Sequence, residues 1–134
     1  MILGIGTDLC DIARIERALE RFGERFAERI LVASELDRFR RHRKPAAYLA
    51  KRFAAKEAFS KALGTGIHFP VSWHNVWVEN ARSGKPSLKF SKPLAALLKR
   101  RGIADVHVSL TDEIGTACAF VVVEGAAPKA RRKR

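Results

Sequence analysis

Residues 52–63, RFAAKEAFSKAL, predict a helix that carries a charged pair on its inward face. At about 100° per residue, Glu57 and Lys61 lie only about 40° apart around such a helix. Three apolar residues lie within about 60° of Glu57: Ala50, Phe53 and Ala54. Glu57 is therefore expected to face the interior, where an unpaired carboxylate would cost roughly several kcal/mol and needs a partner.

Two interpretations of this pair fit the helix equally well. Glutamate followed four residues later by lysine is the favourable order for a helical ion pair, worth about 0.2–0.5 kcal/mol. Alternatively, Glu57 is a functional carboxylate and Lys61 supplies positive charge beside it. The choice between them depends on the other polar residues of the chain.

Apolar periodicity and turn residues place the other helices and strands. A buried strand is expected over residues 2–9, with Asp8 near its end, and Asp11 can cap the helix that follows. The remaining elements are a helix over 12–30 that Gly23 can break, a short helix beginning near Ser34 with Asp37, a basic connector over 38–45, helices over 46–63 and 94–101, and strands over 75–80, 87–91, 105–112 and 116–124. Because this order lacks regular βαβ alternation, the sequence predicts an α+β fold with an antiparallel sheet packed against helices.

Length and composition limit the classes of protein that fit. We expect one domain over residues 1–124, followed by a basic, disordered tail over 125–134. No run reaches the ~18 apolar residues of a membrane helix, and acids interrupt the first apolar segment, so a cytoplasmic protein without a signal peptide is expected. Cys10 and Cys118 lie in apolar segments without metal-binding spacing, which predicts two buried thiols.

The net charge of +12, from 26 Lys and Arg against 14 Asp and Glu, favours an acidic partner. Non-specific nucleic-acid binding through the tail would use this charge, but the sequence has no recognition helix or RNA-binding strand motif. Nucleic-acid binding would also leave the inward carboxylates without a role. A scaffolding domain is the other alternative, and it would tolerate loss of Asp8 or Glu57.

Asp8 and Glu57 together favour a phosphate chemistry. An isolated carboxylate at a strand end is often a simple cap, but two carboxylates with few competing nitrogen or sulfur ligands suit Mg²⁺. Such an ion fills its remaining positions with water and substrate phosphate. Three cations on the central helix then lie where phosphate charge needs neutralising: Arg52, Lys56 and Lys61.

Four segments in order resemble the motifs of the short, trimeric class of 4'-phosphopantetheinyl transferases, the holo-[acyl-carrier-protein] synthases. They are GIGTDLCDIARI (4–15), RFAAKEAFSKALGTGI (52–67), SGKP (83–86), and HVSLTD with ACAFVVVE (107–112 and 117–124). The resemblance implies this family's fold and a homotrimer with active sites between subunits. It also implies transfer of the phosphopantetheine arm of coenzyme A to a serine of acyl carrier protein, in fatty acid biosynthesis, with release of adenosine 3',5'-bisphosphate.

The resemblance also implies roles for individual residues. Asp8 and Glu57 match the metal-binding acids, and the small residues beside Glu57 would leave room for the metal and a pyrophosphate. Glu57, Lys61 and His107 match catalytic positions. The positions that match the coenzyme A cleft are Arg52, Lys56, Lys61, Gly84, Lys85, Pro86, His107, Ser109 and Thr111. A partly buried strand histidine is the alternative for His107.

Two further assignments concern the protein substrate. The acceptor of the serine proton stays open among Glu57, a metal-bound water and Asp112, because Asp112 stands where many family members have histidine. Exposed cations on the predicted helix over 12–30 match the surface that docks the acidic carrier protein: Arg14, Arg21 and Arg25. An ordinary solvated basic face is the alternative, since Glu16, Glu20 and Glu24 run beside them.

Overall fold

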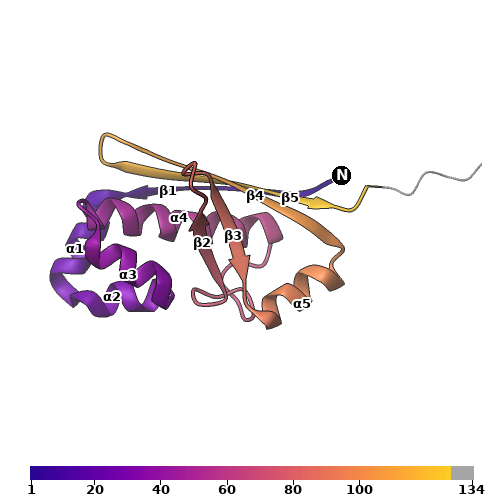
Figure 1. Cartoon of the computed structure of the whole chain (residues 1–134), viewed down its shortest axis with the longest axis horizontal. Helices are drawn as coiled ribbons and strands as arrows, with labels where there is room; N and C mark the ends of the chain where they lie inside the picture. The colour runs from indigo at the N-terminus through magenta and orange to yellow at the C-terminus, as the bar shows by residue number, and fades with distance from the viewer. Residues whose placement is uncertain (128–134) are drawn as a thin grey trace, which may run out of the picture.

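A three-stranded antiparallel sheet with the strand order β1-β5-β4 forms one layer of the protein (Figure 1). The computed structural model describes residues 1–127, so the predicted tail lies outside the described residues from residue 128 onward. The sheet strands are β1 (Ile2–Asp11), β4 (Ile103–Glu113) and β5 (Thr116–Gly125). Helices and a separate two-stranded sheet lie on one side of this layer, which confirms the predicted α+β fold.

The second layer is built around one long helix, α4 (Pro45–Leu63), with Pro45 in its first turn and Gly64 in the left-handed conformation at its end. The other elements of this layer are α1 (Ile12–Phe22), α2 (Glu24–Ile30), α3 (Ala33–Arg41), β2 (Val76–Asn80), β3 (Pro86–Phe90) and α5 (Lys92–Arg100). Helices α1 to α3 gather at one end of the sheet, and α5 lies at the other (Figure 1). None of the helices in residues 1–127 is long and apolar enough to cross a membrane.

Strand β1 and helix α4 touch through their backbones. A Cβ atom at Gly4 would lie 2.0 Å from the carbonyl oxygen of Ala62, and one at Gly6 would lie 1.9 Å from that of Ala58. Only glycine fits at both strand positions, because the clashing atoms are main-chain atoms that cannot rotate away. Ala58 and Ala62 therefore make room for β1, whereas Ala50 and Ala54, the small residues predicted beside Glu57, are fully buried.

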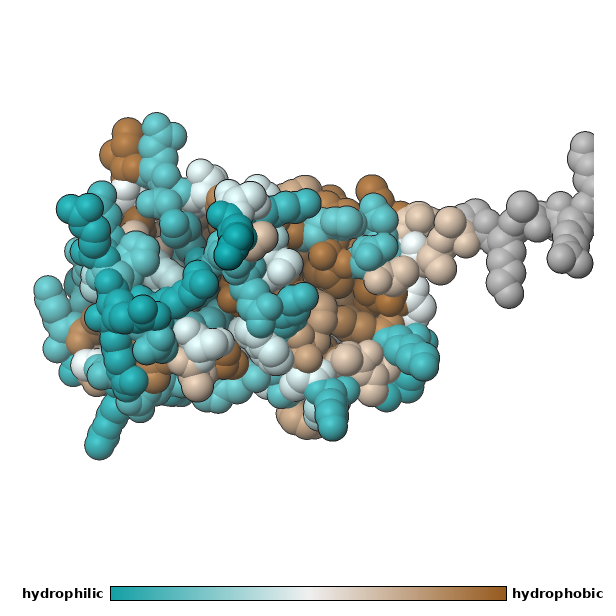
Figure 2. Space-filling view, viewed as in Figure 1, coloured by the Kyte–Doolittle hydropathy of each residue, from teal (hydrophilic) through white to brown (hydrophobic). Residues whose placement is uncertain are grey.

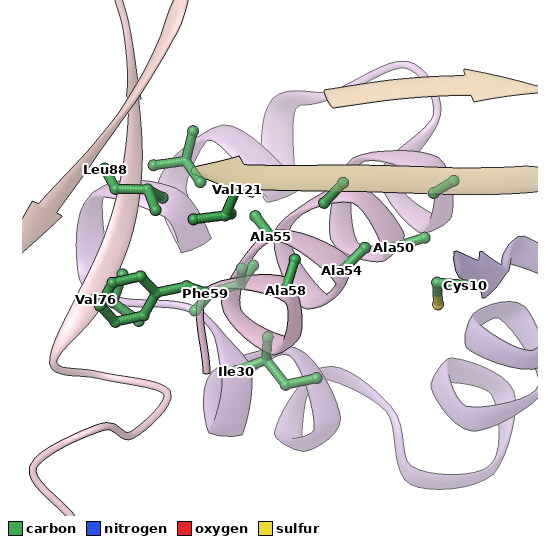
Figure 3. Close-up of a cluster of buried hydrophobic side chains, with 14 of the residues drawn as sticks. Cys10, Ile30, Ala50, Ala54, Ala55, Ala58, Phe59, Val76, Leu88 and Val121 are labelled. Carbon is green, nitrogen blue, oxygen red and sulfur yellow. The ribbon is translucent and has the colours of Figure 1, made fainter. Parts of the chain in front are cut away.

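Most of α4 is buried, and its larger side chains form the rest of the core (Figure 3). Phe59 is fully buried and its ring centroid lies 5.3 Å from that of Phe90 on β3. In Figure 3, Phe59 points toward Val76 of β2, while the alanines of α4 lie along the large sheet. The helix thus joins the two sheets, with small residues toward one and an aromatic residue toward the other.

The structure confirms some local predictions and corrects others. Gly23, at φ 66°, breaks the predicted 12–30 helix into α1 and α2, which confirms the break expected there. Helix α3 begins at Ala33, because the Glu35 carboxylate accepts the Val32 N–H at 3.1 Å, and it extends through Arg41 into the predicted connector. Cys10 is buried as predicted, but Cys118 is only half-buried. The predicted Asp11 cap is confirmed, since Ala13 N–H donates to Asp11 Oδ1 at 3.0 Å.

Candidate active site

Asp8 and Lys61 form an ion pair across β1 and α4, with 2.9 Å between Oδ1 and Nζ. Lys61 also donates to the Thr7 carbonyl at 3.2 Å. The Asp8 side chain is 13% exposed and that of Lys61 53%, so Lys61 lies at the rim and not on the inward face that the sequence predicted. The second oxygen of Asp8, Oδ2, is buried and has no hydrogen-bond partner among the described residues. One oxygen of this carboxylate therefore still lacks a partner in residues 1–127.

Glu57 lies half-buried one turn before Lys61 on α4. Burial raises the pKa of Glu57, and the nearby Asp8 charge raises it further, against the lowering effects of Lys61 and Arg14. The hydrogen bond to Asp8 is the main cause of a raised pKa for Lys61. In the described part of the chain, Lys61 donates to Asp8 and Thr7 and not to Glu57, so the predicted helical ion pair does not form. Two neighbouring carboxylates that repel one another fit a site for a cation.

A basic cavity of about 510 Å³ opens beside α4. Its lining residues are Arg38, Arg41, His42, Tyr48, Lys51, Arg52 and Asn80. Arg52 is almost completely buried; it donates to Asn80 Oδ1 at 2.7 Å, and its guanidinium carbon lies 4.2 Å from the centre of the Tyr48 ring. Arg52 Nε and the Tyr48 hydroxyl are buried without partners in residues 1–127. Unused buried donors among several cations suit a phosphate group.

Asn80 connects this cavity to the predicted Gly84 turn. Its side-chain amide accepts from Arg52 and donates to the Gly84 carbonyl at 3.0 Å. Gly84 has φ 89°, as the predicted turn between β2 and β3 requires. The structure thereby brings the turn, with Lys85 and Pro86, next to Arg52.

Sequence reasoning missed several residues of this cavity: Arg38, Arg41, His42, Tyr48 and Asn80. The basic run over 38–45 predicts only a connector when it is taken by its composition. Its first four residues belong to α3, and residues 38 and 41 lie three apart on that helix. This helical spacing was the signal that could have placed them together.

Lys56 is the clearest error among the predicted site residues. Its side chain is fully buried, and its ammonium group donates to the Ile30 carbonyl at 2.6 Å, to Glu35 Oε1 at 2.7 Å and to the Trp73 carbonyl at 2.8 Å. An ammonium group has three N–H donors, and all three are used inside the protein. Lys56 therefore has no donor left for a phosphate of a ligand.

The predicted residues of β4 lie on the far face of the sheet from Asp8. Asp8 and Leu110 both pair with Ala119, a fully buried residue of β5, so all three face α4. The alternate residues of β4 are exposed on the opposite face: His107, Ser109 and Thr111. His107 Nε2 lies 3.6 Å from Glu124 Oε1 on that face. One chain does not bring the two predicted sets into a single site.

Asp112 lies apart from Glu57. It forms an ion pair with Lys51 at 3.0 Å, and Lys51 precedes Glu57 by six residues, or about 9 Å along the axis of α4. Within one chain, Asp112 is thus engaged at a different point of α4 from the Asp8 and Lys61 pair. Glu57 is the predicted proton acceptor that lies beside this pair.

The predicted docking arginines belong to α1 and α2. The end of the molecule where these helices lie is largely hydrophilic (Figure 2). Arg14, Arg21 and Arg25 are all exposed, and Arg14 is close enough to Glu57 to lower its pKa. Arg21 lies over the ring of Phe22, which is itself exposed. This basic surface adjoins the carboxylate pair of the same chain.

Known proteins resemble this chain over nearly its whole length. Residues 4–118 match the family described as "4'-phosphopantetheinyl transferase superfamily". Proteins named "Holo-[acyl-carrier-protein] synthase" from Nitrosomonas eutropha and Nitrosomonas europaea are 52% and 53% identical over 124 residues, covering 92% of this chain and 99% of theirs.

Solved structures agree with the sequence relatives. The crystal structure of a holo-[acyl-carrier-protein] synthase from Neisseria meningitidis matches with a TM-score of 0.90 and 48% identity, over 92% of this chain and 99% of that one. A synthase from Bacillus anthracis, described as in complex with CoA (3',5'-ADP), matches with a TM-score of 0.79 and 38% identity, over 94% and 99%. The chain with its Asp8, Glu57 and Lys61 cluster therefore belongs to the 4'-phosphopantetheinyl transferase superfamily.

Proposed function

We propose that the protein is a holo-[acyl-carrier-protein] synthase, which transfers the 4'-phosphopantetheine group of coenzyme A to a serine of apo-acyl carrier protein. The observation that carries this proposal is the Asp8 and Lys61 pair beside Glu57, in a chain whose relatives bear that name over almost their full length. The other product is adenosine 3',5'-bisphosphate. Fatty acid biosynthesis is the process that would use the holo-carrier protein.

We infer that Mg²⁺ is the cofactor and that Asp8 and Glu57 hold it. The buried, unpartnered Oδ2 of Asp8 and the raised pKa of Glu57 fit a cation at this point. Residues 1–127 contain no group of three or more His, Cys, Asp or Glu side chains suited to a metal, and Mg²⁺ is an ion that binds through one or two carboxylates. When bound, the ion would offset negative charge on the pyrophosphate.

The side chains of this cluster supply the remaining chemistry. The serine oxygen attacks the β-phosphorus of coenzyme A, and the bond from that phosphorus to the oxygen of the α-phosphate breaks. Lys61, exposed at the rim, is placed to stabilise negative charge on the attacked phosphate. We assign the serine proton to Glu57, because Asp112 is engaged by Lys51 elsewhere on α4.

We place the phosphorylated adenosine end of coenzyme A in the basic cavity. Arg52 Nε and the Tyr48 hydroxyl offer donors that are unused within residues 1–127, and Asn80 links the Gly84 turn to Arg52. The cations of the cavity would neutralise the 3'-phosphate. Lys56 has no part in this contact, since its donors are used within the protein.

We infer that the complete site is shared between copies of the chain in a homotrimer. The sheet face that carries His107, Ser109 and Thr111 also exposes large apolar side chains: Ile5, Leu9 and Phe120. Exposed apolar groups of this size favour burial by a partner. A second copy on this face would bury them and could bring its own Asp8 and Glu57 to the His107 row. Three such head-to-tail contacts close a ring.

Mass spectrometry of the carrier protein tests the proposed function. The protein is incubated with apo-acyl carrier protein, coenzyme A and Mg²⁺, and the carrier protein should gain the mass of one phosphopantetheine arm. EDTA should prevent this gain. No gain in the complete mixture would refute the transferase, and an undiminished gain in EDTA would refute only the metal assignment.

A further inference from the structure

A buried ion pair outside the proposed site links α4 to α3. The side chains of Lys56 and Glu35 are both 0% exposed, and 2.7 Å separates Nζ from Oε1. Lys56 also donates to carbonyls at the end of α2 (Ile30) and in the loop before β2 (Trp73). The ammonium group thus joins three segments to α4 at one point.

Glu35 extends these links to the small sheet. Its Oε1 accepts the Val32 N–H at 3.1 Å, and its Oε2 accepts the Val78 N–H of β2 at 3.0 Å. Each carboxylate oxygen therefore holds a backbone amide, and one of them also holds Lys56. Apolar side chains of similar volume often stabilise a core as well as a buried ion pair does. The position that the Lys56 and Glu35 pair imposes on the segments it links is thus a better explanation for this buried ion pair than stability alone.

A series of contacts connects the buried ion pair to the basic cavity. Val78 and Asn80 are two residues apart on β2 and so face the same side of that strand. Asn80 accepts from Arg52, and Arg52 lies one helical turn before Lys56 on α4. Lys56, Glu35, Val78, Asn80 and Arg52 therefore close a ring of contacts between α4 and β2.

A different contact fixes the carboxylate cluster. Gly4 and Gly6 of β1 lie directly against the backbone of α4 at Ala62 and Ala58. This contact sets the position of Glu57 relative to β1 without the help of Lys56. Loss of the buried ion pair should therefore disturb the basic cavity and leave the carboxylate cluster in place.

We propose that Lys56 and Glu35 are positioning residues for the coenzyme: they hold β2 against α4 so that Asn80 keeps the Arg52 guanidinium aimed into the basic cavity. This inference rests on the proposed function, because it assigns the cavity to coenzyme A. It predicts a defect in coenzyme binding, distinct from a defect in transfer or in carrier-protein docking.

Steady-state kinetics of Lys56→Met test the proposal. The KM for coenzyme A should rise about tenfold, the effect of losing roughly one hydrogen bond to a charged group. The kcat and the KM for acyl carrier protein should stay within about twofold of the wild type. Lys99→Met, the same change at an exposed position of α5, is the matched control and should alter none of these values. An unchanged KM for coenzyme A in folded Lys56→Met would overturn the proposal.

A double-mutant cycle tests whether Lys56 acts through Asn80. Asn80→Ala should raise the KM for coenzyme A, and Lys56→Met combined with Asn80→Ala should raise it no further. Effects of the two changes that multiply would show independent roles and would contradict the proposed route.

Glu35→Gln provides a second variant if Lys56→Met does not fold. The amide can keep one oxygen for Lys56 and Val32, but its NH₂ group cannot accept the Val78 N–H. A folded Glu35→Gln protein with a wild-type KM for coenzyme A would refute the link through β2. If wild-type protein shows no transfer at all, the proposed function fails, and calorimetric titration of the variants with adenosine 3',5'-bisphosphate then tests the positioning role on its own.

Discussion

Asp8 is the residue on which the proposed site depends most directly. Lys61 engages one of its carboxylate oxygens, and the other is buried without a partner in residues 1–127. The strand position could be read from the sequence, because a short apolar run ends near an acid. The partner could not, since helical spacing makes Lys61 a neighbour of Glu57 and says nothing of β1, which lies 53 residues away in the chain.

Asp8→Asn should reduce kcat about 100-fold or more while the protein stays folded. The amide keeps the shape of the side chain but removes the charge that Lys61 and the proposed ion require. Mass spectrometry of the carrier protein measures the rate, and circular dichroism checks the fold. Asp105→Asn, at an exposed position of β4, is the control for the same chemical change. Near-normal transfer by Asp8→Asn would contradict the metal assignment.

The raised pKa of Glu57 predicts how the stability of the metal-free protein depends on pH. This pKa is raised in the folded protein, first by burial and then by Asp8, so the folded state binds the Glu57 proton more tightly than the unfolded state does. Stability should therefore fall as the pH rises from about 4.5, the ordinary value, through the raised pKa. In EDTA, Glu57→Gln should unfold at a higher temperature than the wild type at pH 7, with a smaller difference at pH 4.5. Calorimetry at both pH values measures this, and an equal difference at both would contradict it.

At the scale of elements, the helices and strands with strong local signals were predicted well. The α4 helix with its Gly64 stop and the turn around Gly84 both follow from neighbouring residues. Lys56 was misplaced because its burial depends on Glu35, a partner 21 residues away on another helix. Local periodicity could not distinguish this lysine from Lys61, which lies at the rim of the same helix.

The close contact between β1 and α4 predicts that adding one methyl group at Gly6 lowers both stability and activity. Gly6→Ala would place Cβ 1.9 Å from the Ala58 carbonyl oxygen, so strand and helix must separate. We expect a loss of about 1–3 kcal/mol in unfolding free energy, as for other overpacked cores. We also expect a lower kcat, because Asp8 moves with the strand. Urea unfolding measures the first effect. Ala104→Val, at an exposed position of β4, should change stability by less than about 0.5 kcal/mol.

The basic surface of α1 predicts a salt-dependent defect in carrier-protein docking. Arg14→Ala with Arg21→Ala should raise the KM for acyl carrier protein about tenfold at low salt and less at high salt, because exposed charges are screened. The KM for coenzyme A should not change. Arg100→Ala on α5, also exposed, is the control. An equal defect at all salt concentrations would favour the alternative of an ordinary solvated face.

At the scale of the whole molecule, the sequence could predict that side chains alternate between the two faces of β4. It could not predict which of these faces lies on the same side of the sheet as Asp8. The pattern separates His107, Ser109 and Thr111 from the inward valines. Which face Asp8 shares depends on strand order and register, because Asp8 reaches β4 only through Ala119 of β5. The placement of these residues on opposite faces therefore depends on tertiary structure and not on local sequence.

Complementation between inactive variants tests whether sites are shared between subunits. Asp8→Asn and His107→Ala should each be poorly active alone. Mixed after unfolding and refolding together, they should recover about a quarter of wild-type activity, since random mixing in a ring gives that fraction of sites two intact contributors. Each variant refolded alone is the control. No recovery from mixed, assembled protein would show that the residues do not act in one shared site.

The backbone contact at Gly4 and Gly6 also determines which substitutions in the core the site can tolerate. Because no side chain separates β1 from α4 there, main-chain atoms set the spacing between the two elements that carry Asp8 and Glu57. Substitutions elsewhere in the core can alter side-chain packing without changing the distance between β1 and α4. Redesign of the hydrophobic interior therefore has wide freedom, provided that two hydrogen atoms, one on each glycine, are left as they are.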